Sequence, residues 1–301
     1  MILVVGASGL LGTQICRELT QACKPIRALV RKSTDPEKQK TLQSLGAILV
    51  YGDLKDRSTL DEACRGISTV ISTASSTLSR QAGDSIESVD AQGQFNLVQA
   101  AKAAGVQHFI FISFAPIPMD FALQRAKRAA ERALAESGIA YTVLQPTMFT
   151  EVWLGPHLGF DAANASAQIF GSGQNSISWI SYVDVARFAA ASVDNAAANN
   201  CVILLGGPEA LSPLQVVQIF EEIGGRKFKV THVPEEVLLA QRAGATDSMQ
   251  EAFATLMLSD AQGSVIDMEP ALRVFPKQIS ERQGVRQFAQ SMFPTTPGIV
   301  R

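Results

Sequence analysis

The sequence opens with the apolar run Ile2 to Val5 and continues directly into Gly6-Ala7-Ser8-Gly9-Leu10-Leu11-Gly12. The run predicts a buried parallel strand, and the apolar spacing after it predicts a helix over residues 10–21. A glycine-rich turn between a strand and a helix is typical of dinucleotide-binding folds, although the spacing here is GxxGxxG and not GxGxxG. We expect Gly6 to allow the tight exit from the strand, Gly9 to let the backbone approach a pyrophosphate, and Gly12 to let the helix pack closely. The alternative is a turn that binds nothing.

Strands and helices alternate through the first half of the 301-residue chain. Short runs rich in Ile, Val and Leu predict strands, and longer amphipathic segments between them predict helices. This rhythm predicts an α/β fold, a doubly wound parallel sheet of the Rossmann type. The predicted strands are residues 2–5, 26–30, 47–51, 69–73, 109–113 and 141–144. The predicted helices are residues 10–21, 36–45, 58–64, 86–104 and 123–136.

The rhythm breaks after Gln145 and Pro146. Helices and a further strand without the βαβ order predict a smaller C-terminal α+β substrate region. We therefore expect a cofactor-binding Rossmann domain over residues 1–150 and a substrate region over residues 151–301, partly interleaved with it. The helices predicted here are residues 182–193, 213–223, 235–243, 247–258 and 279–290, and the strand is residues 201–204.

The composition excludes several classes of protein. The chain is 47% hydrophobic and 18% charged with a formal net charge of -2, which argues against disorder and against binding nucleic acid. Its four cysteines lack the spacing of a metal site, and no uncharged apolar run is long enough to cross a bilayer. With no signal-like segment before the first strand, we expect a cytoplasmic protein that uses no metal and binds no membrane.

Two cations end the second predicted strand. Arg31 and Lys32 stand where an NAD-binding fold places Asp or Glu against the ribose hydroxyls, and no acid follows before Asp35. Because arginine can hold a phosphate through two parallel hydrogen bonds, the pair favours the 2′-phosphate of NADP. The alternative is a solvated basic loop.

An acid follows the third predicted strand. Asp53 can accept a hydrogen bond from the adenine amino group, or it can cap the helix that begins near Ser58. The sequence alone leaves both roles open.

Together with later segments, these motifs resemble the NmrA-like group of atypical short-chain dehydrogenase/reductases, which includes quinone- and triphenylmethane-reductase-type enzymes and redox-sensing regulators. The resemblance covers most of the chain. It rests on GASGLLG at 6–12, LVRK at 29–32, GDL at 52–54, FIS at 111–113, Lys127 with Glu131, and GSGQNSISWISYVDVA at 171–186.

The resemblance implies an NADP(H) site, with Arg31 at the 2′-phosphate, Asp53 at adenine, Thr73 to Ser75 in the loop after the fourth strand, and Lys127 near the nicotinamide ribose. Positions at the carboxyl ends of strands add further candidates, since ligands of open α/β sheets bind there. The predicted cofactor contacts are Gly6, Ser8, Gly9, Leu11, Gly12, Arg31, Lys32, Asp53, Leu54, Thr73, Ala74, Ser75, Ser113, Lys127, Gln145, Pro146, Thr147 and Phe149.

One departure concerns catalysis. Related reductases of the ordinary kind carry Tyr-x-x-x-Lys, and four residues before Lys127 stands Leu123, which cannot donate a proton. A quinone or a cationic dye accepts hydride without a positioned acid, so we expect an NADPH-dependent reductase of a small aromatic or quinone-like electrophile, with Lys127 as the candidate catalytic residue. Lys127 alternatively is a surface cation that pairs with Glu131. Three aromatic residues are candidates for an apolar wall of the substrate site: Phe149, Trp153 and Trp179.

Two other functions fit the same features. A non-catalytic regulator would bind NADP(H) to sense redox state and act through a protein partner. An assembly or scaffold factor, of the kind found among cyanobacterial and plastid NmrA-like proteins, would need an exposed apolar patch.

Overall fold

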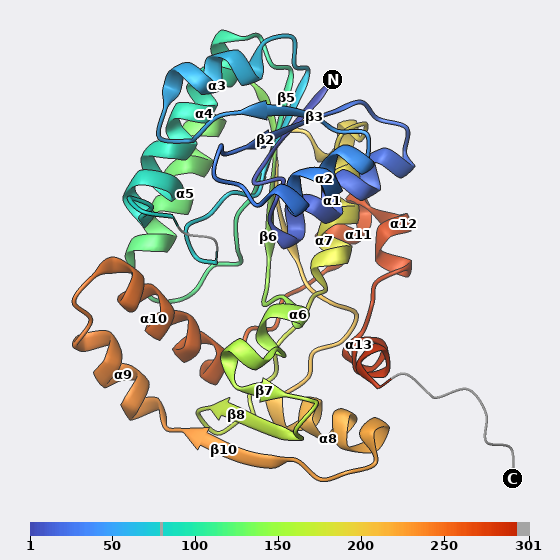
Figure 1. Cartoon of the computed structure of the whole chain (residues 1–301). Helices are drawn as coiled ribbons and strands as arrows, with labels where there is room; N and C mark the ends of the chain where they lie inside the picture. Colours follow the sequence, from blue (N-terminus) through green and yellow to red (C-terminus); the bar gives the residue numbers. More distant parts are fainter. Residues whose placement is uncertain (79–80, 294–301) are drawn as a thin grey trace, which may run out of the picture.

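Seven parallel strands form the central sheet of the protein, seen here in a computed structural model that describes residues 1–78 and 81–293 (Figure 1). Buried runs such as Leu3 to Val5 and Phe109 to Ile112 form strands because helices cover both faces of the sheet. The expected doubly wound α/β fold is thereby confirmed. In spatial order the strands are β3 (Ile48–Tyr51), β2 (Ile26–Val30), β1 (Ile2–Val5), β4 (Thr69–Ser72), β5 (His108–Ile112), β6 (Ala140–Pro146) and β9 (Cys201–Leu205).

Two helical layers bury the two faces of this sheet, as Figure 1 shows. In the first helix, Leu11, Ile15 and Leu19 recur every four residues and form one buried apolar stripe. The layer to which that helix belongs contains α1 (Leu10–Gln21), α2 (Pro36–Ser44), α7 (Tyr182–Ser192), α11 (Glu269–Val274) and α12 (Pro276–Ser280). The opposite layer contains α3 (Arg57–Cys64), the π-helical segment η1 (Ile86–Ala91) with α4 (Gln92–Ala103), and α5 (Ala122–Ala135).

A smaller three-stranded sheet lies beyond the carboxyl edge of the main sheet (Figure 1). Its core includes Phe160 and Phe220, whose ring centroids lie 4.7 Å apart in an edge-to-face arrangement. Its strands, in spatial order, are β10 (Lys229–Val233), β8 (Ser166–Phe170) and β7 (Phe160–Asp161). The helices of this part are α6 (Thr150–Trp153), α8 (Pro213–Gly224), α9 (Glu235–Ala243), α10 (Ser248–Gln262) and α13 (Val285–Met292).

Two of the predicted helices differ from those observed. The helix predicted over residues 86–104 opens as η1, with a π-helical turn. The prediction of one helix over residues 279–290 is wrong, because Ser280 ends α12 and α13 begins only after Gly284. The sequence also gave no indication of β10, whose residues are largely exposed and lack an apolar alternation.

The second half of the chain contributes to both sheets, since β9 and α7 pack into the main sheet while β7, β8 and β10 form the small one. Interleaving of this kind was expected, and a division into domains at residue 150 stays a prediction. The last residues of the predicted substrate region, 294–301, lie outside the described part of the chain.

Candidate functional site

The glycine-rich turn connects β1 to α1 at the carboxyl edge of the main sheet, and its three glycines meet different surroundings. A Cβ atom on Gly12 would lie 2.1 Å from the Gly6 carbonyl oxygen, and one on Gly6, where φ is 81°, would lie 2.7 Å from Thr73 Oγ1. Both positions exclude a side chain for reasons internal to the fold. A Cβ atom on Gly9 would meet only the Gly6 carbonyl oxygen, at 3.3 Å. The fold therefore restricts Gly9 much less than Gly6 or Gly12, and the sequence assigns the space beside Gly9 to a pyrophosphate.

The amino end of α1 is open to an anion. Gly9 is its N-cap, and no side chain caps the helix there. Free amides at a helix amino terminus attract phosphate groups through hydrogen bonds and the helix dipole. Ser8 is half-buried beside them, whereas the Leu11 side chain packs into the core. The turn thus has the geometry of a phosphate cradle.

The two cations after β2 have different surroundings. Arg31 Nη1 donates to Asp84 Oδ2 at 2.6 Å, while Lys32 is exposed. Arg31 is therefore no solvated loop residue. The Asp84 carboxylate, which the sequence reasoning missed, also accepts from Lys55 Nζ at 2.6 Å. No spacing rule connects Arg31 to an acid so far along the chain, so no local sequence signal could have indicated this pair.

Asp53 follows β3 at the same edge and does not cap α3. Its Oδ1 accepts from the Lys55 amide at 2.9 Å, and the α3 cap is Asp56, which accepts from the Ser58 amide at 3.1 Å. Of the two roles left open, helix capping is wrong for Asp53. Leu54 is buried in the core, so only its backbone is available to a ligand.

Lys127 lies in the interior, only 4% exposed. Its Nζ lies 3.3 Å from Asp90 Oδ1 in η1 and 5.1 Å from the centroid of the Phe111 ring. Asp90 Oδ2 in turn accepts from the Ser76 amide and hydroxyl at 3.0 and 2.6 Å. The interpretation of Lys127 as a surface partner of Glu131 is wrong. The lysine instead connects α5 to η1 and to the loop after β4.

Glu131 belongs to a neighbouring polar group. It accepts from Arg128, and its two oxygens accept from Gln145 Nε2 at 3.0 and 3.1 Å. Arg128 also donates to Ser113 Oγ at 3.3 Å and to the Phe114 carbonyl at 2.7 Å. The Ser113 and Gln145 side chains thus already have partners on α5, and a cofactor would have to share or replace them.

The remaining predicted contacts lie on segments that follow β4 and β6. Thr73 donates its amide to the Val5 carbonyl at 2.9 Å, which holds the loop of Thr73, Ala74 and Ser75 against the end of β1. Pro146 ends β6, and the Thr147 amide donates to the Leu205 carbonyl at 2.9 Å, which ties this segment to β9. Both segments lie at the carboxyl edge, as the sequence predicted for a ligand site.

The three candidate aromatic residues do not form one wall. Phe149 packs against the main core, whereas Trp153 and Trp179 pack in the core of the smaller part. The two tryptophans line a small pocket together with Asp260, whose side chain is 4% exposed. Burial raises the pKa of this carboxyl to about 7. Asp260 was not among the predicted site residues, since it lies beyond the helix predicted over residues 247–258 and a single acid carries no signal of burial.

The position of the missing tyrosine is filled by core packing. Leu123 is 3% exposed and packs with Ile86, Phe121 and Met249. His108 is also a packing residue, because its Nε2 lies 2.9 Å from Thr142 Oγ1 within the sheet and burial lowers its pKa. Neither position offers an acid to a substrate.

Within residues 1–78 and 81–293, no helix has both the length and the apolar character needed to span a membrane. The same residues contain no cluster of three or more His, Cys, Asp or Glu side chains suited to a metal ion.

Known proteins resemble the chain along most of its length. The family model described as NmrA-like family matches residues 1–280. Photosystem II assembly factor Ycf39 of Cyanophora paradoxa is 32% identical over 239 residues, which cover 77% of this chain and 71% of that protein. An NAD(P)H azoreductase of Xenophilus azovorans is 28% identical over 279 residues, covering 90% and 92%.

Solved structures share the fold. The NADPH-dependent quinone oxidoreductase QOR2 of Escherichia coli, in complex with NADPH, superimposes with a TM-score of 0.77 at 23% identity, covering 97% of this chain and 100% of that one. At this identity the likeness extends to the fold and no further.

Proposed function

The chain belongs to the NmrA-like family, and we propose that it is an NADPH-dependent reductase that transfers hydride to a small aromatic or quinone-like electrophile. The observation that carries the cofactor assignment is the contrast among the three glycines of the turn. The fold requires glycine at Gly6 and Gly12, while a Cβ atom on Gly9, which lies beside uncapped helix amides, would meet only one carbonyl oxygen, at 3.3 Å. The relative named as an azoreductase, which matches over most of both chains, supports a reductase.

The proposed roles of the residues follow the edge of the sheet. The amides after Gly9 bind the pyrophosphate, Arg31 contacts the 2′-phosphate, and Asp53 faces adenine. The ends of β4 and β6, with Lys127 beneath them, surround the nicotinamide, which supplies the hydride when bound. Trp153 and Trp179 supply an apolar wall for the substrate.

The acceptor class follows from what the site lacks. Reduction of a ketone needs a proton donor placed beside the oxygen, and Leu123 occupies that position within the core. A quinone takes hydride first and then a proton from water, so it needs no positioned phenol. An azo compound or a cationic dye likewise needs no positioned phenol to accept hydride. We therefore assign electron-poor aromatic acceptors and not simple alcohols or ketones.

Stopped-flow absorbance of the reduced nicotinamide tests this assignment. The protein, mixed with NADPH and a panel of quinones, azo dyes and aldehydes, should oxidise NADPH with the quinones or dyes and not with the aldehydes. NADPH should also bind at least about tenfold more tightly than NADH, since a charge-assisted contact from Arg31 is worth about 1.5 to 3 kcal/mol. Absorbance that persists with every acceptor, or an Arg31→Ala variant with an unchanged preference, would contradict the proposal.

A second candidate function rests on the relatives named as photosystem II assembly factors. In that function the protein binds NADP(H) and acts through a protein partner without turnover. Its test uses isolated photosystem II subunits from a cyanobacterium as the probe, with binding measured in the presence and absence of NADPH. Binding that depends on NADPH, combined with persistent absorbance in the acceptor panel, would favour this function over the reductase.

A further inference from the structure

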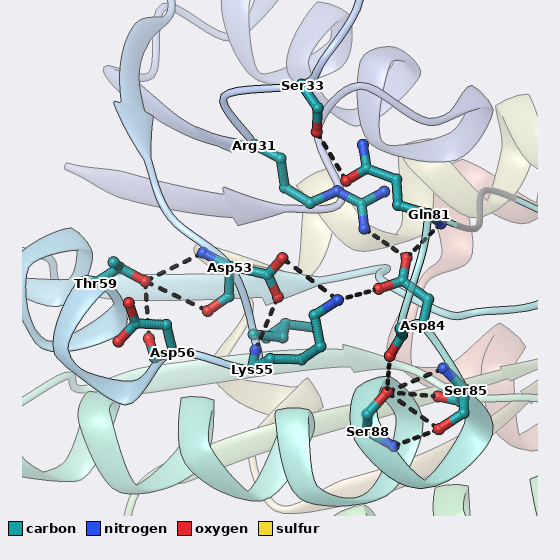
Figure 2. A network of polar contacts seen from close by, with 12 residues as sticks. Arg31, Ser33, Asp53, Lys55, Asp56, Thr59, Gln81, Asp84, Ser85 and Ser88 are labelled. Carbon is teal, nitrogen blue, oxygen red and sulfur yellow. Dashed lines mark hydrogen bonds and ion pairs between the residues drawn. The ribbon is translucent and has the colours of Figure 1, made fainter.

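A single carboxylate joins the two cations beside the predicted 2′-phosphate position (Figure 2). Asp84 Oδ2 accepts from Arg31 Nη1 and Asp84 Oδ1 accepts from Lys55 Nζ, each at 2.6 Å. The Asp84 side chain is 1% exposed, whereas those of Arg31 and Lys55 are 25% and 29% exposed. Both cations therefore keep part of their surface accessible to a ligand while they pair with the buried acid.

Hydrogen bonds and backbone conformation hold the turn that contains Asp84. Asp84 Oδ2 also accepts from the Gln81 amide at 2.8 Å, and Gly83 adopts φ 80°, a left-handed conformation that suits glycine. Ser88 Oγ donates to the Gly83 carbonyl at 3.0 Å, and Ser85 forms a capping box with Ser88 at the start of η1. These contacts of the local backbone thus fix the position of the carboxylate beside the two cations.

The formal charges of the side chains around Asp84 cancel. Arg31 and Lys55 face Asp84, and Asp53 Oδ2 lies 3.8 Å from Lys55 Nζ. Burial acts to raise the pKa of Asp84, but the hydrogen bonds from Lys55, the Gln81 amide and Arg31 outweigh it, so that the pKa of this carboxyl is lowered. At neutral pH the acid is therefore ionised, and two positive charges face two negative ones.

We propose that Asp84 sets the selectivity of the site between dinucleotides, because its carboxylate competes with the 2′-phosphate of NADP(H) for Arg31 and Lys55. This inference rests on the proposed function and adds a residue to it. A dinucleotide with a free 2′-hydroxyl leaves the three-residue cluster intact and can donate that hydroxyl to the carboxylate. NADP(H) must share or displace the same carboxylate, at a cost to its affinity. Asp84 thereby reduces, without reversing, the preference for NADP(H) that the two cations provide.

Nucleotide fragments test the competition without turnover. Calorimetry compares adenosine 2′,5′-bisphosphate with 5′-AMP, which differ in the 2′-phosphate, on the wild-type chain and on Asp84→Asn. We expect the variant to bind the bisphosphate about tenfold more tightly, equivalent to about 1.4 kcal/mol, with less than about a twofold change for 5′-AMP. The control is Asp61→Asn, which removes one negative charge from a half-exposed side chain of α3 that pairs with Arg57. It should change neither constant.

A second variant keeps the test independent of how Asp84→Asn folds. Ser88→Ala removes the hydrogen bond to the Gly83 carbonyl and loosens the turn without touching a charge, so it should also tighten bisphosphate binding, by a smaller factor. Unchanged bisphosphate binding in both variants would overturn the competition, and weaker binding would overturn it by showing that Asp84 orients Arg31 for the phosphate. If the wild-type chain binds NADPH normally in that case, the proposed function stands and only the role of Asp84 fails. If no chain binds either fragment or NADPH, both fail.

Discussion

Replacement of Gly9 by valine separates the needs of the ligand from those of the fold. The Gly9 backbone has φ −82° and ψ 171°, which valine can adopt, and the new Cβ would make one close contact, 3.3 Å from the Gly6 carbonyl oxygen. Loss of a favourable N-cap residue should cost about 1 kcal/mol of stability. The branched side chain would nevertheless fill the space assigned to the pyrophosphate.

The expected loss of binding is much larger than the loss of stability. If the pyrophosphate gives up two charge-assisted hydrogen bonds to the helix amides, each worth about 1.5 to 3 kcal/mol, NADPH affinity falls by at least about 100-fold. Calorimetry with NADPH measures the affinity, and thermal melting followed by circular dichroism measures the stability. A folded Gly9→Val variant that binds NADPH as the wild type does would refute the assignment of this turn to the cofactor.

Two other glycines supply the controls for this experiment. Gly244 has φ −89°, and its Cβ would meet a carbonyl oxygen, that of Ala240, at the same 3.3 Å. Gly244→Val should therefore introduce a similar close contact with a backbone oxygen and leave NADPH binding unchanged. Gly12→Ala should instead destabilise the fold, because its Cβ would lie 2.1 Å from the Gly6 carbonyl oxygen. The three variants together distinguish a binding effect from a packing effect.

Three further predictions concern buried positions. Lys127→Met should cost about 3 to 5 kcal/mol of stability because it leaves the Asp90 charge buried and unpaired. In urea titrations, the double variant with Asp90→Asn should regain most of that stability. Hydride transfer by the double variant should stay low if Lys127 positions the nicotinamide. Asp260 has a folded-state pKa of about 7 against 3.8 in the unfolded chain, so the stability that its protonation provides is present below pH 4 and lost as the pH rises to about 7. The stability of Asp260→Asn relative to wild type should therefore be greater at pH 8 than at pH 4, by at most about 4 kcal/mol. A stability difference that does not change with pH in urea titrations would contradict this. Leu123→Tyr should lower the melting temperature, since overpacking costs about 1 to 3 kcal/mol, and should not speed quinone reduction.

The fold of the first half was predictable because its signals are local. Apolar runs such as Ile26 to Val30 contain their own evidence of burial, and the helix predicted to end at residue 104 is followed by Gly105, whose φ of 71° suits the end of a helix. The smaller part was less predictable because its strands depend on partners far along the chain. β10 pairs with β8 through Val230 and Ala167, among others, although most of the β10 residues are exposed. Such a strand is stabilised by its neighbour and not by an apolar pattern of its own.

The candidate site shows the same division between local and distant signals. Gly6, Gly9 and Gly12 were placed by their spacing, because a strand, a turn and a helix follow one another there. The pairing of Lys127 with Asp90 and that of Arg31 with Asp84 depend on how α5 and the strand ends pack against η1 and the turn before it. The sequence instead suggested Glu131 for Lys127, since residues four apart on a helix are neighbours. Tertiary contacts of opposite charge took precedence over that local rule.

Asp84 and Asp90 lie on one short segment, and this segment therefore contacts both ends of the proposed cofactor site. Asp84 faces the 2′-phosphate corner just before η1, and Asp90 faces Lys127 within η1. A dinucleotide that displaces Asp84 therefore acts on the segment that fixes the buried lysine, whereas one that leaves Asp84 in place does not. Because the capping box of Ser85 and Ser88 joins the turn to η1, a change at Asp84 reaches Asp90 through one hydrogen-bonded turn. We accordingly expect Ser88→Ala to weaken this connection, so that bisphosphate binding improves while the hydrogen exchange of the η1 amides increases.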